Sequence, residues 1–266
     1  MLANLTHYSL IERHQQKQDM NRILIAREEL QEDGICILAG RRAAHIADVL
    51  HPVEGQKVKI GIIGGPCGTG IIQHIGPEHV TLNCELEETN DVPERIDLLL
   101  AMPRPKVMKR LWAPIASFGP GRILITSAGK VEKNYFATHW LAPEFYRPLL
   151  VEGLEQSGRT AMPSVSIHKQ LKPLLEDELA GWPVKLFAHP ASPQRMIETN
   201  IPPHGRILLA IGPEGGWTEY ERELFQSLGF LPVSLGTAAL RSDVACISAL
   251  AVLSEVMARQ RNILNT

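Results

Sequence analysis

The chain has 266 residues, enough for one large domain or two modest ones. Hydrophobic residues make up 44% and charged residues 21%, which excludes a disordered tail protein, a disulfide mini-scaffold and a fibrous repeat. The 27 Lys and Arg residues against 29 Asp and Glu residues give a formal charge of −2. This balance disfavours a protein that holds nucleic acid chiefly by charge.

Neither metal binding nor membrane insertion is indicated by the sequence. The four cysteines, Cys36, Cys67, Cys84 and Cys246, form no C-x-x-C pair, so they are interpreted as small core residues in a reducing compartment. No apolar run reaches the roughly 18 residues that a membrane span needs. Residues 1–19 are polar and lack the apolar centre of a signal peptide, so we expect an extension outside the fold and a cytoplasmic protein.

In the first part of the chain, short apolar runs follow one another closely after a strand-like run at residues 21–25. They cover residues 35–38, 58–63, 70–75 and 80–86. Turns rich in Gly, Pro and Glu separate them, and one helical stretch is expected at residues 42–50. This rhythm predicts a small β-barrel. The acidic residues 85–94 are predicted to be a linker. The Gly-rich residues 61–70 lack the Lys of a phosphate-binding P-loop, so a hairpin loop is expected there.

The second part of the chain has a different rhythm. Strand-like runs at residues 96–102, 122–126, 184–188, 206–211 and 231–235 are separated by longer segments of helical character. Nearly continuous Val, Ile and Leu strands indicate a buried parallel sheet with crossover helices. The sequence therefore predicts an α/β domain whose ligands bind at the carboxyl ends of its strands.

The loop after the strand at residues 206–211 has the composition of a ligand-binding loop. It reads Gly212-Pro213-Glu214-Gly215-Gly216, and Thr218 with Glu221 has the spacing of a capping box, so a helix is expected from Glu219. Glycines let a ligand approach the backbone closely. An ordinary tight turn is the alternative.

A second Gly-bearing loop follows the strand at residues 231–235. It runs from Gly236 to Asp243 and brings Arg241 beside Asp243. An apolar helix is expected over residues 244–257, with Ser242 or Asp243 as its N-cap. The alternative interpretation of Arg241 and Asp243 is a surface ion pair plus a helix cap.

Taken together, these loops resemble the RsmE-type ribosomal RNA small-subunit methyltransferases, which make 3-methyluridine. The strongest match is Leu209-Ala210-Ile211-Gly212-Pro213-Glu214-Gly215-Gly216-Trp217-Thr218 with Glu221. The others are Leu235-Gly236 with Leu240-Arg241-Ser242-Asp243-Val244-Ala245, Glu155-Gln156-Ser157-Gly158-Arg159-Thr160 with Pro163, and Met20-Asn21-Arg22-Ile23-Leu24 with His45, Val49 and Leu50.

The resemblance implies an architecture. It predicts the extension 1–19, a PUA-like β-barrel RNA-binding domain over residues 20–91, and an α/β domain of SPOUT type over residues 92–266. In that domain the C-terminal chain would form a trefoil knot, an arrangement that general fold rules disfavour. The resemblance also implies a homodimer, no metal, and a small-subunit ribosomal RNA or 30S particle as partner.

The resemblance further implies S-adenosyl-L-methionine as cofactor and assigns residues to roles. The cofactor-binding residues would be His189, Ile211, Gly212, Pro213, Gly216, Leu235, Gly236, Leu240 and Ser242. Contacts to RNA would come from Arg22, His45, Arg104, Lys106 and Arg159.

The chemistry of uridine-N3 methylation fits the residues of these loops. The N3 nitrogen must lose a proton, which the carboxylate of Asp243 or Glu214 would accept, while Arg241 would stabilise charge on the uracil oxygens. The base must be single-stranded or extruded to react.

Departures from the family pattern leave two alternatives open. A Lys and a Glu common in the family are missing from residues 113–119, His51 replaces an Arg, and Asp243-Val244 stands where Glu-Thr is usual. A knotted RNA-binding or ribosome-assembly module without catalysis is one alternative, and a small-molecule α/β enzyme is the other.

The charge balance divides unevenly along the chain. Residues 22–88 hold 6 Lys and Arg against 10 Asp and Glu, and basic residues gather at 41–42, 104–110 and 130–133. We therefore expect a dimer to assemble these patches into one RNA track with a modest salt dependence.

Overall fold

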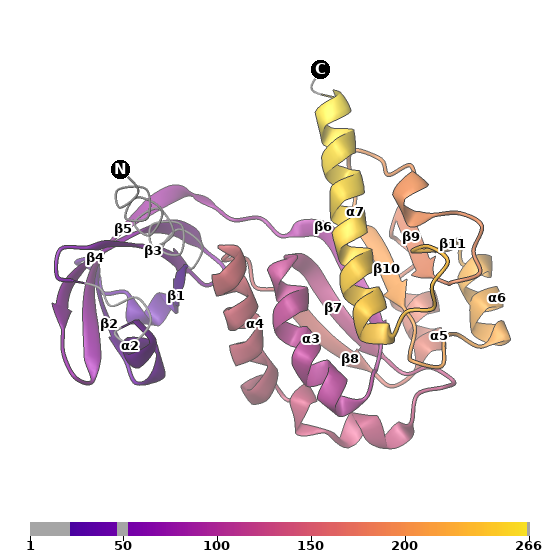
Figure 1. Cartoon of the computed structure of the whole chain (residues 1–266), viewed down its shortest axis with the longest axis horizontal. Coiled ribbons are helices and arrows are strands. Elements are labelled where there is room, and N and C mark those ends of the chain that lie inside the picture. Colours follow the sequence, from indigo (N-terminus) through magenta and orange to yellow (C-terminus); the bar gives the residue numbers. More distant parts are fainter. Residues whose placement is uncertain (1–21, 47–52, 265–266) are drawn as a thin grey trace, which may run out of the picture. The chain divides into compact units, whose positions relative to one another are not determined.

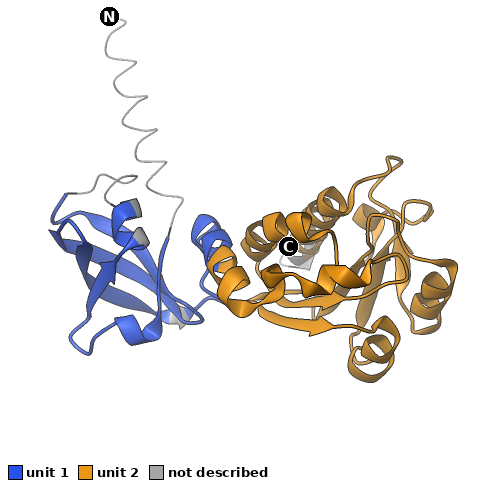
Figure 2. Cartoon of the chain, turned by 90° about the horizontal axis from the view of Figure 1, so that it is seen from below, with its two compact units in different colours: residues 1–92, 151–162 blue, residues 93–150, 163–266 orange. Residues whose placement is uncertain are grey.

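The computed structural model describes residues 22–46 and 53–264 (Figure 1). The chain divides into two compact units (Figure 2). Unit 1 comprises the chain up to Val92 together with Val151–Met162, and unit 2 comprises Pro93–Leu150 and the chain from Pro163 onward. Residues 151–162 lie in the second domain of the sequence prediction but pack with unit 1. Glu155 and Thr160 hold this segment there through hydrogen bonds to the backbone of unit 1.

Unit 1 is built on a curled five-stranded sheet of order β1-β3-β4-β5-β2. The strands are β1 (Ile23–Ile25), β2 (Ile35–Ala39), β3 (Lys57–Ile62), β4 (Pro66–Ile75) and β5 (His79–Asn90). β1 pairs parallel with β3, and the other neighbours pair antiparallel. One side of the sheet packs a core that includes Leu38, Ile60, Ile72 and Leu82, all fully buried.

The predicted strands of unit 1 are confirmed, and so is the hairpin within residues 61–70, where Gly61 pairs with Cys67. Two helices accompany the sheet, the 3₁₀ helix η1 (Arg27–Glu29) and the α-helix α2 (Arg41–His45). α2 confirms the start of the helix expected at 42–50, and residues 47–50 lie outside the described part of the chain.

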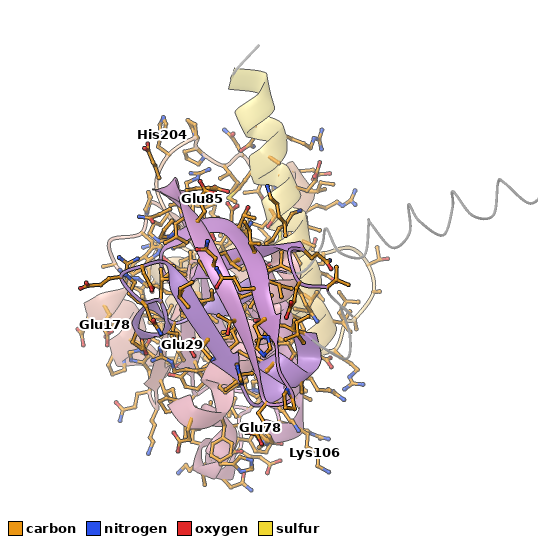
Figure 3. All side chains as sticks on the ribbon, turned by 90° about the vertical axis from the view of Figure 1, so that its left-hand side faces the viewer. Glu29, Glu78, Glu85, Lys106, Glu178 and His204 are labelled. Atoms are coloured by element: carbon orange, nitrogen blue, oxygen red, sulfur yellow. The ribbon has the colours of Figure 1, made fainter. Side chains whose placement is uncertain are left out.

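The linker predicted at residues 85–94 is wrong. β5 continues to Asn90, and the first strand of unit 2, β6 (Glu94–Ala101), begins four residues later. Val80 and Leu82 of β5 are buried, whereas the alternating Glu85 and Glu87 are exposed (Figure 3). The acidic residues thus occupy the solvent face of a half-buried strand that pairs with β4.

Unit 2 contains a six-stranded parallel sheet of order β11-β9-β10-β6-β7-β8. Besides β6, its strands are β7 (Pro120–Thr126), β8 (Ser164–His168), β9 (Val184–Ala188), β10 (Ile207–Ile211) and β11 (Leu231–Val233). The predicted parallel sheet is confirmed, and β10 is buried along its whole length. β8 was not predicted, because it is an edge strand of sequence Ser-Val-Ser-Ile-His rather than an apolar run.

Helices lie between these strands along the chain, in a mixed α/β arrangement (Figure 1). The α-helices are α3 (Pro105–Ser117), α4 (Pro143–Ser157), α5 (Leu171–Pro173), α6 (Glu219–Ser227) and α7 (Ser242–Leu264). Shorter turns are the 3₁₀ helices η3 (Lys133–Ala137), η4 (His139–Leu141) and η6 (Met196–Glu198) and the π-helix η5 (Leu174–Glu178). In the described residues no helix is both long and apolar enough for a membrane span.

The two predicted helix starts have different outcomes. α6 begins at Glu219 with the expected capping box, in which Thr218 and Glu221 bond each other's backbone amides. The prediction that Ser242 or Asp243 caps the last helix is wrong, because α7 already begins at Ser242. The amide of Ala245 donates to the carbonyl of Arg241 at 2.7 Å, so the helical hydrogen bonds start at Arg241.

Candidate cofactor cavity

A cavity of about 410 Å³ lies at the carboxyl ends of three neighbouring strands of unit 2. The loops after β9, β10 and β11 and the first turn of α7 form it, as the strand-end rule predicts. All nine residues that the sequence analysis assigned to cofactor binding line this cavity: His189, Ile211, Gly212, Pro213, Gly216, Leu235, Gly236, Leu240 and Ser242. Residues from three separate loops therefore converge on one site.

Glycines shape two of the lining loops. A side chain at Gly212 would place its Cβ 3.2 Å from the ring of Trp217, so even a methyl group fits only if the ring moves by a few tenths of an ångström. Gly216 and Gly236 adopt φ values of 68° and 125°, which L-residues with side chains rarely adopt. Glycine at these positions leaves the backbone open to a ligand.

Two buried polar atoms in the cavity lining lack a partner. Within the described part of the chain, the buried indole Nε1 of Trp217 donates no hydrogen bond, and the buried hydroxyl Oγ of Ser242 makes none. Trp217 is only 5% exposed and Ser242 only 4%. Because leaving buried polar groups unpaired costs about 1–3 kcal/mol each, such atoms are characteristic of a site completed by a ligand.

The buried carboxylate of Glu221 supports the loop after β10 through hydrogen bonds. Glu221 is 5% exposed, and its Oε1 accepts from the Gly129 amide at 2.7 Å while its Oε2 accepts from the Thr218 amide at 2.7 Å. Lys130 lines the cavity and donates from Nζ to the Gly215 carbonyl at 2.8 Å. Glu221 was predicted only as a capping residue, and the place of Lys130 in the cavity was not predicted. No local pattern links the loop at residues 129–130 to the loop after β10.

His189, directly after β9, and Arg222, on α6, both line the cavity. The His189 amide donates to the Val233 carbonyl at 2.9 Å, which joins the loop after β9 to the end of β11. Burial lowers the pKa of the His189 imidazole, and the nearby Arg222 guanidinium lowers this pKa further. The ring is therefore held in its neutral form at neutral pH. Arg222 had no signal in the sequence.

Of the three candidate catalytic residues, Glu214 lines the cavity, whereas Arg241 and Asp243 flank the lining residue Ser242 at the cavity mouth. Glu214 is exposed and accepts a hydrogen bond from the Arg104 amide at 3.2 Å. Asp243 lies between two guanidinium groups, with its Oδ2 3.3 Å from Nη2 of Arg110 and 3.5 Å from Nη2 of Arg241. The Arg241–Asp243 pair expected from the sequence is formed, and Arg110 joins it from α3.

The five residues assigned to RNA contact are divided between the two units. Arg104 and Lys106 are exposed at the start of α3 in unit 2. In unit 1, Arg22 donates from Nη1 to the Ile60 carbonyl at 2.8 Å, and Arg159 lies 3.6 Å from Asp91. The side chain of His45 lies outside what the structure describes.

The motif at residues 155–160 forms hydrogen bonds within unit 1 and lines no part of the cavity. Glu155 accepts from the Leu24 amide at 3.2 Å, and the Thr160 hydroxyl donates to the Gly65 carbonyl at 2.6 Å. Asp91 accepts from the amides of Thr160 and Ala161 at 2.9 and 3.1 Å. These bonds tie the end of α4 to the curled sheet.

Comparison with known proteins connects this geometry to a family. Residues 90–254, more than half of the chain, match the family model of the RNA methyltransferase domain. The chain belongs to the RNA methyltransferase family. This confirms the family resemblance expected from the loop motifs, and the matched residues include every loop of the cavity.

The relatives named in the comparison extend along most of the chain. The ribosomal RNA small subunit methyltransferase E of Treponema pallidum is 28% identical over 246 residues, covering 88% of this chain and 90% of the relative. Ribosomal RNA small subunit methyltransferase E 1 of Borreliella burgdorferi is also 28% identical, covering 86% and 95%. The crystal structure of a ribosomal RNA small subunit methyltransferase E from Neisseria gonorrhoeae, bound to S-adenosyl methionine, shares the fold. Its TM-score is 0.72 at 22% identity, covering 89% of this chain and 98% of that one.

The described residues contain no group of three or more His, Cys, Asp or Glu side chains arranged to hold a metal ion. All four cysteines are free thiols, and Cys36 and Cys246 are buried.

Proposed function

We propose that this RNA methyltransferase transfers a methyl group from S-adenosylmethionine to N3 of a uridine in small-subunit ribosomal RNA. The observation that carries the proposal is the convergence of nine motif residues on one cavity. The names of the Treponema and Borreliella relatives support the ribosomal substrate, and the cofactor bound to the Neisseria protein supports the methyl donor. A ribosomal substrate also supports the cytoplasm as the place of reaction.

The cavity fits the proposed cofactor. Its volume of about 410 Å³ is within the range of small-molecule sites, about 300–1,000 Å³. The glycine loops leave room for the cofactor against the backbone, and the unpaired Trp217 Nε1 and Ser242 Oγ are available to its polar groups. A neutral His189 adds no further positive charge to a cavity that would hold a sulfonium and is already lined by Lys130 and Arg222. When bound, S-adenosylmethionine supplies a methyl group activated by that positively charged sulfur.

The residues at the cavity mouth supply the remaining chemistry. The carboxylate of Asp243 or of Glu214 accepts the N3 proton as the nitrogen–methyl bond forms. The Arg241 guanidinium, 71% exposed and free to approach a base, stabilises negative charge on the uracil oxygens. Asp243 orients Arg241, and Arg110 holds Asp243 from the side of α3. Most of the rate comes from orientation of the two reactants.

For RNA binding we retain Arg104 and Lys106, because both are exposed close to the cavity mouth. Arg22 and Arg159 each contact a group of unit 1 through Nη1, which favours a structural role for them. We also propose that unit 1 is the PUA-like RNA-binding domain. Its acidic balance suits recognition of one structured site rather than tight non-specific binding.

We further propose the knot and the homodimer of the family for unit 2. The knot is supported by contacts between α7 and the β9–β10 connection, where Gln260 bonds the Ile201 amide at 3.2 Å and the Thr199 carbonyl at 3.4 Å. The homodimer is supported by the outward face of α7, where Val244, Ala251 and Ala258 are exposed at seven-residue spacing. Light scattering of the purified protein tests the dimer.

The proposed reaction is tested by methylation of small-subunit rRNA and of 30S particles from a strain that lacks the modification. Nucleoside mass spectrometry identifies the modified base and atom, and 3-methyluridine is the expected product. Arg241→Ala is expected to abolish the product while leaving S-adenosylmethionine binding intact in calorimetry. Loss of the rate at neutral pH in Asp243→Asn or in Glu214→Gln identifies the base. Saturable cofactor binding without any methylated nucleoside would overturn the proposal, and so would a product methylated elsewhere.

A further inference from the structure

A cluster of aromatic rings lies on unit 2 outside the cavity. We define the ring cluster as His139, Trp140 and Phe145. The ring centroids of His139 and Trp140 are 4.3 Å apart, those of His139 and Phe145 are 4.7 Å apart, and those of Trp140 and Phe145 are 5.9 Å apart. His139 is exposed and Phe145 is 41% exposed, so these rings do not serve as core packing.

The ring cluster is held in place by a buried aromatic residue beneath it. Trp112 on α3 is fully buried and donates from Nε1 to the Trp140 carbonyl at 3.0 Å. Its ring also packs 4.9 Å from that of Tyr146, the residue after Phe145. The Thr138 hydroxyl accepts from the Trp140 amide at 3.3 Å and caps η4. The exposed rings are therefore fixed before any partner binds, which lowers the entropic cost of binding.

Positive charge lies directly beside the ring cluster. Nζ of Lys109 lies 4.4 Å from the ring centroid of Trp140, within the range of a cation–π contact. Lys106, one turn earlier on α3, extends into solvent (Figure 3). Arg110, the residue after Lys109, reaches Asp243 at the cavity mouth. The first turns of α3 thus connect the ring cluster to the candidate active site.

We propose that the ring cluster is a stacking site for an unpaired nucleotide of the RNA substrate, next to the nucleotide that is methylated. Planar rings with adjacent amines suit a flat base and its phosphate, whereas a docked protein segment would need apolar area without a particular ring geometry. Nucleotides beside an extruded base are themselves unstacked, so they gain from a new stacking partner. This inference rests on the proposed RNA methylation.

The test uses the full-length protein in two assays. The first measures KM and kcat for methylation of protein-free small-subunit rRNA, and the second measures the anisotropy of a fluorescein-labelled oligouridylate of about ten nucleotides. Phe145→Ala is expected to raise the rRNA KM and the oligonucleotide Kd about five- to thirty-fold, with kcat and the S-adenosylmethionine Kd unchanged. Tyr220→Ala is the matched control, because Tyr220 is 57% exposed on α6 and lies outside the ring cluster.

Two further substitutions separate stacking from other uses of the surface. Phe145→Trp retains an aromatic face and is expected to bind RNA as the unmodified protein does. Phe145→Leu keeps apolar area but removes the face, and is expected to lose nearly as much as Phe145→Ala. Full RNA binding by Phe145→Leu would overturn the stacking proposal, because apolar area without an aromatic face would then be enough. A change of oligomeric state in Phe145→Ala would overturn it in favour of a second copy.

The two proposals fail in distinguishable ways. Unchanged KM and oligonucleotide Kd in Phe145→Ala and His139→Ala would overturn the stacking site while the methylation proposal stands. If the unmodified protein methylates no RNA, the oligonucleotide assay still decides whether the ring cluster binds single-stranded RNA.

Discussion

The cavity loops and the segment of residues 155–160 both carry motifs of the same family, yet their polar groups are used differently. In the cavity, Trp217 Nε1 and Ser242 Oγ are buried without partners. In the segment, Glu155 and Thr160 bond the backbone of Leu24 and Gly65. Among the described residues, Nε of Arg22 in unit 1 is also buried without a partner, so an unpaired atom indicates a ligand only where it also lines a cavity, as Trp217 Nε1 and Ser242 Oγ do. The family motifs alone do not make this distinction.

The largest effect is expected at the cavity, from Gly212→Val. The new side chain would collide with the Trp217 ring, which lies 3.2 Å from the position of a Cβ at residue 212. We expect S-adenosylmethionine affinity to fall by about a hundredfold in calorimetry. Gly181→Ala is the control, because nothing lies within 4 Å of a Cβ at residue 181. Unchanged affinity in Gly212→Val would remove this loop from the binding site.

In unit 1, Asp91→Ala tests the structural side of the comparison. This substitution removes the acceptor for the amides of Thr160 and Ala161 and the partner of Arg159. The free energy of unfolding is expected to fall by about 3 kcal/mol in urea denaturation, with cofactor affinity unchanged. Glu78→Ala, at an exposed turn, is the control. Loss of cofactor binding in folded Asp91→Ala would contradict the division of roles.

Glu221→Gln weakens the support of the loop after β10 without changing a residue that lines the cavity. The amide has one acceptor oxygen where the carboxylate has two, so the Gly129 or the Thr218 amide loses its partner. We expect a loss of about 2 kcal/mol in unfolding free energy. Cofactor affinity is expected to fall about tenfold, because the loop after β10 shifts. Glu223→Gln, exposed on the same helix, is expected to change neither quantity.

The smallest effect concerns the pH dependence conferred by His189. Its pKa is lowered by burial and by Arg222, so folding favours the neutral ring. The resulting stabilisation is complete above the ordinary histidine pKa and is lost as the pH falls through the lowered value. Protonation also adds a positive charge to the cavity that would hold a sulfonium, so we expect cofactor affinity to decline as the pH falls below the ordinary histidine pKa of about 6.5.

His189→Asn is expected to flatten this decline. The control is His204→Asn, at an exposed position of the β9–β10 connection (Figure 3). An equally flat profile in the control would mean that another group causes the dependence.

The sequence predicted the elements whose causes are local. β10 is a continuous apolar run because both faces of the parallel sheet are covered at this strand. The capping box predicted the start of α6 because its two residues, Thr218 and Glu221, are only three positions apart in the chain. β8 and the acidic end of β5 were not predicted, because their strand conformation depends on pairing with distant partners rather than on their own composition.

The sequence by itself determined which loops carry the site, because glycines that follow a predicted strand can be located directly in the sequence. Only the tertiary structure decided what surrounds them. Glu221 reaches Gly129 across 92 residues of sequence, and Arg110 reaches Asp243 across 133. These contacts exist because the sheet order places β7, β10 and α3 near one another, and no local pattern in the chain specifies that order.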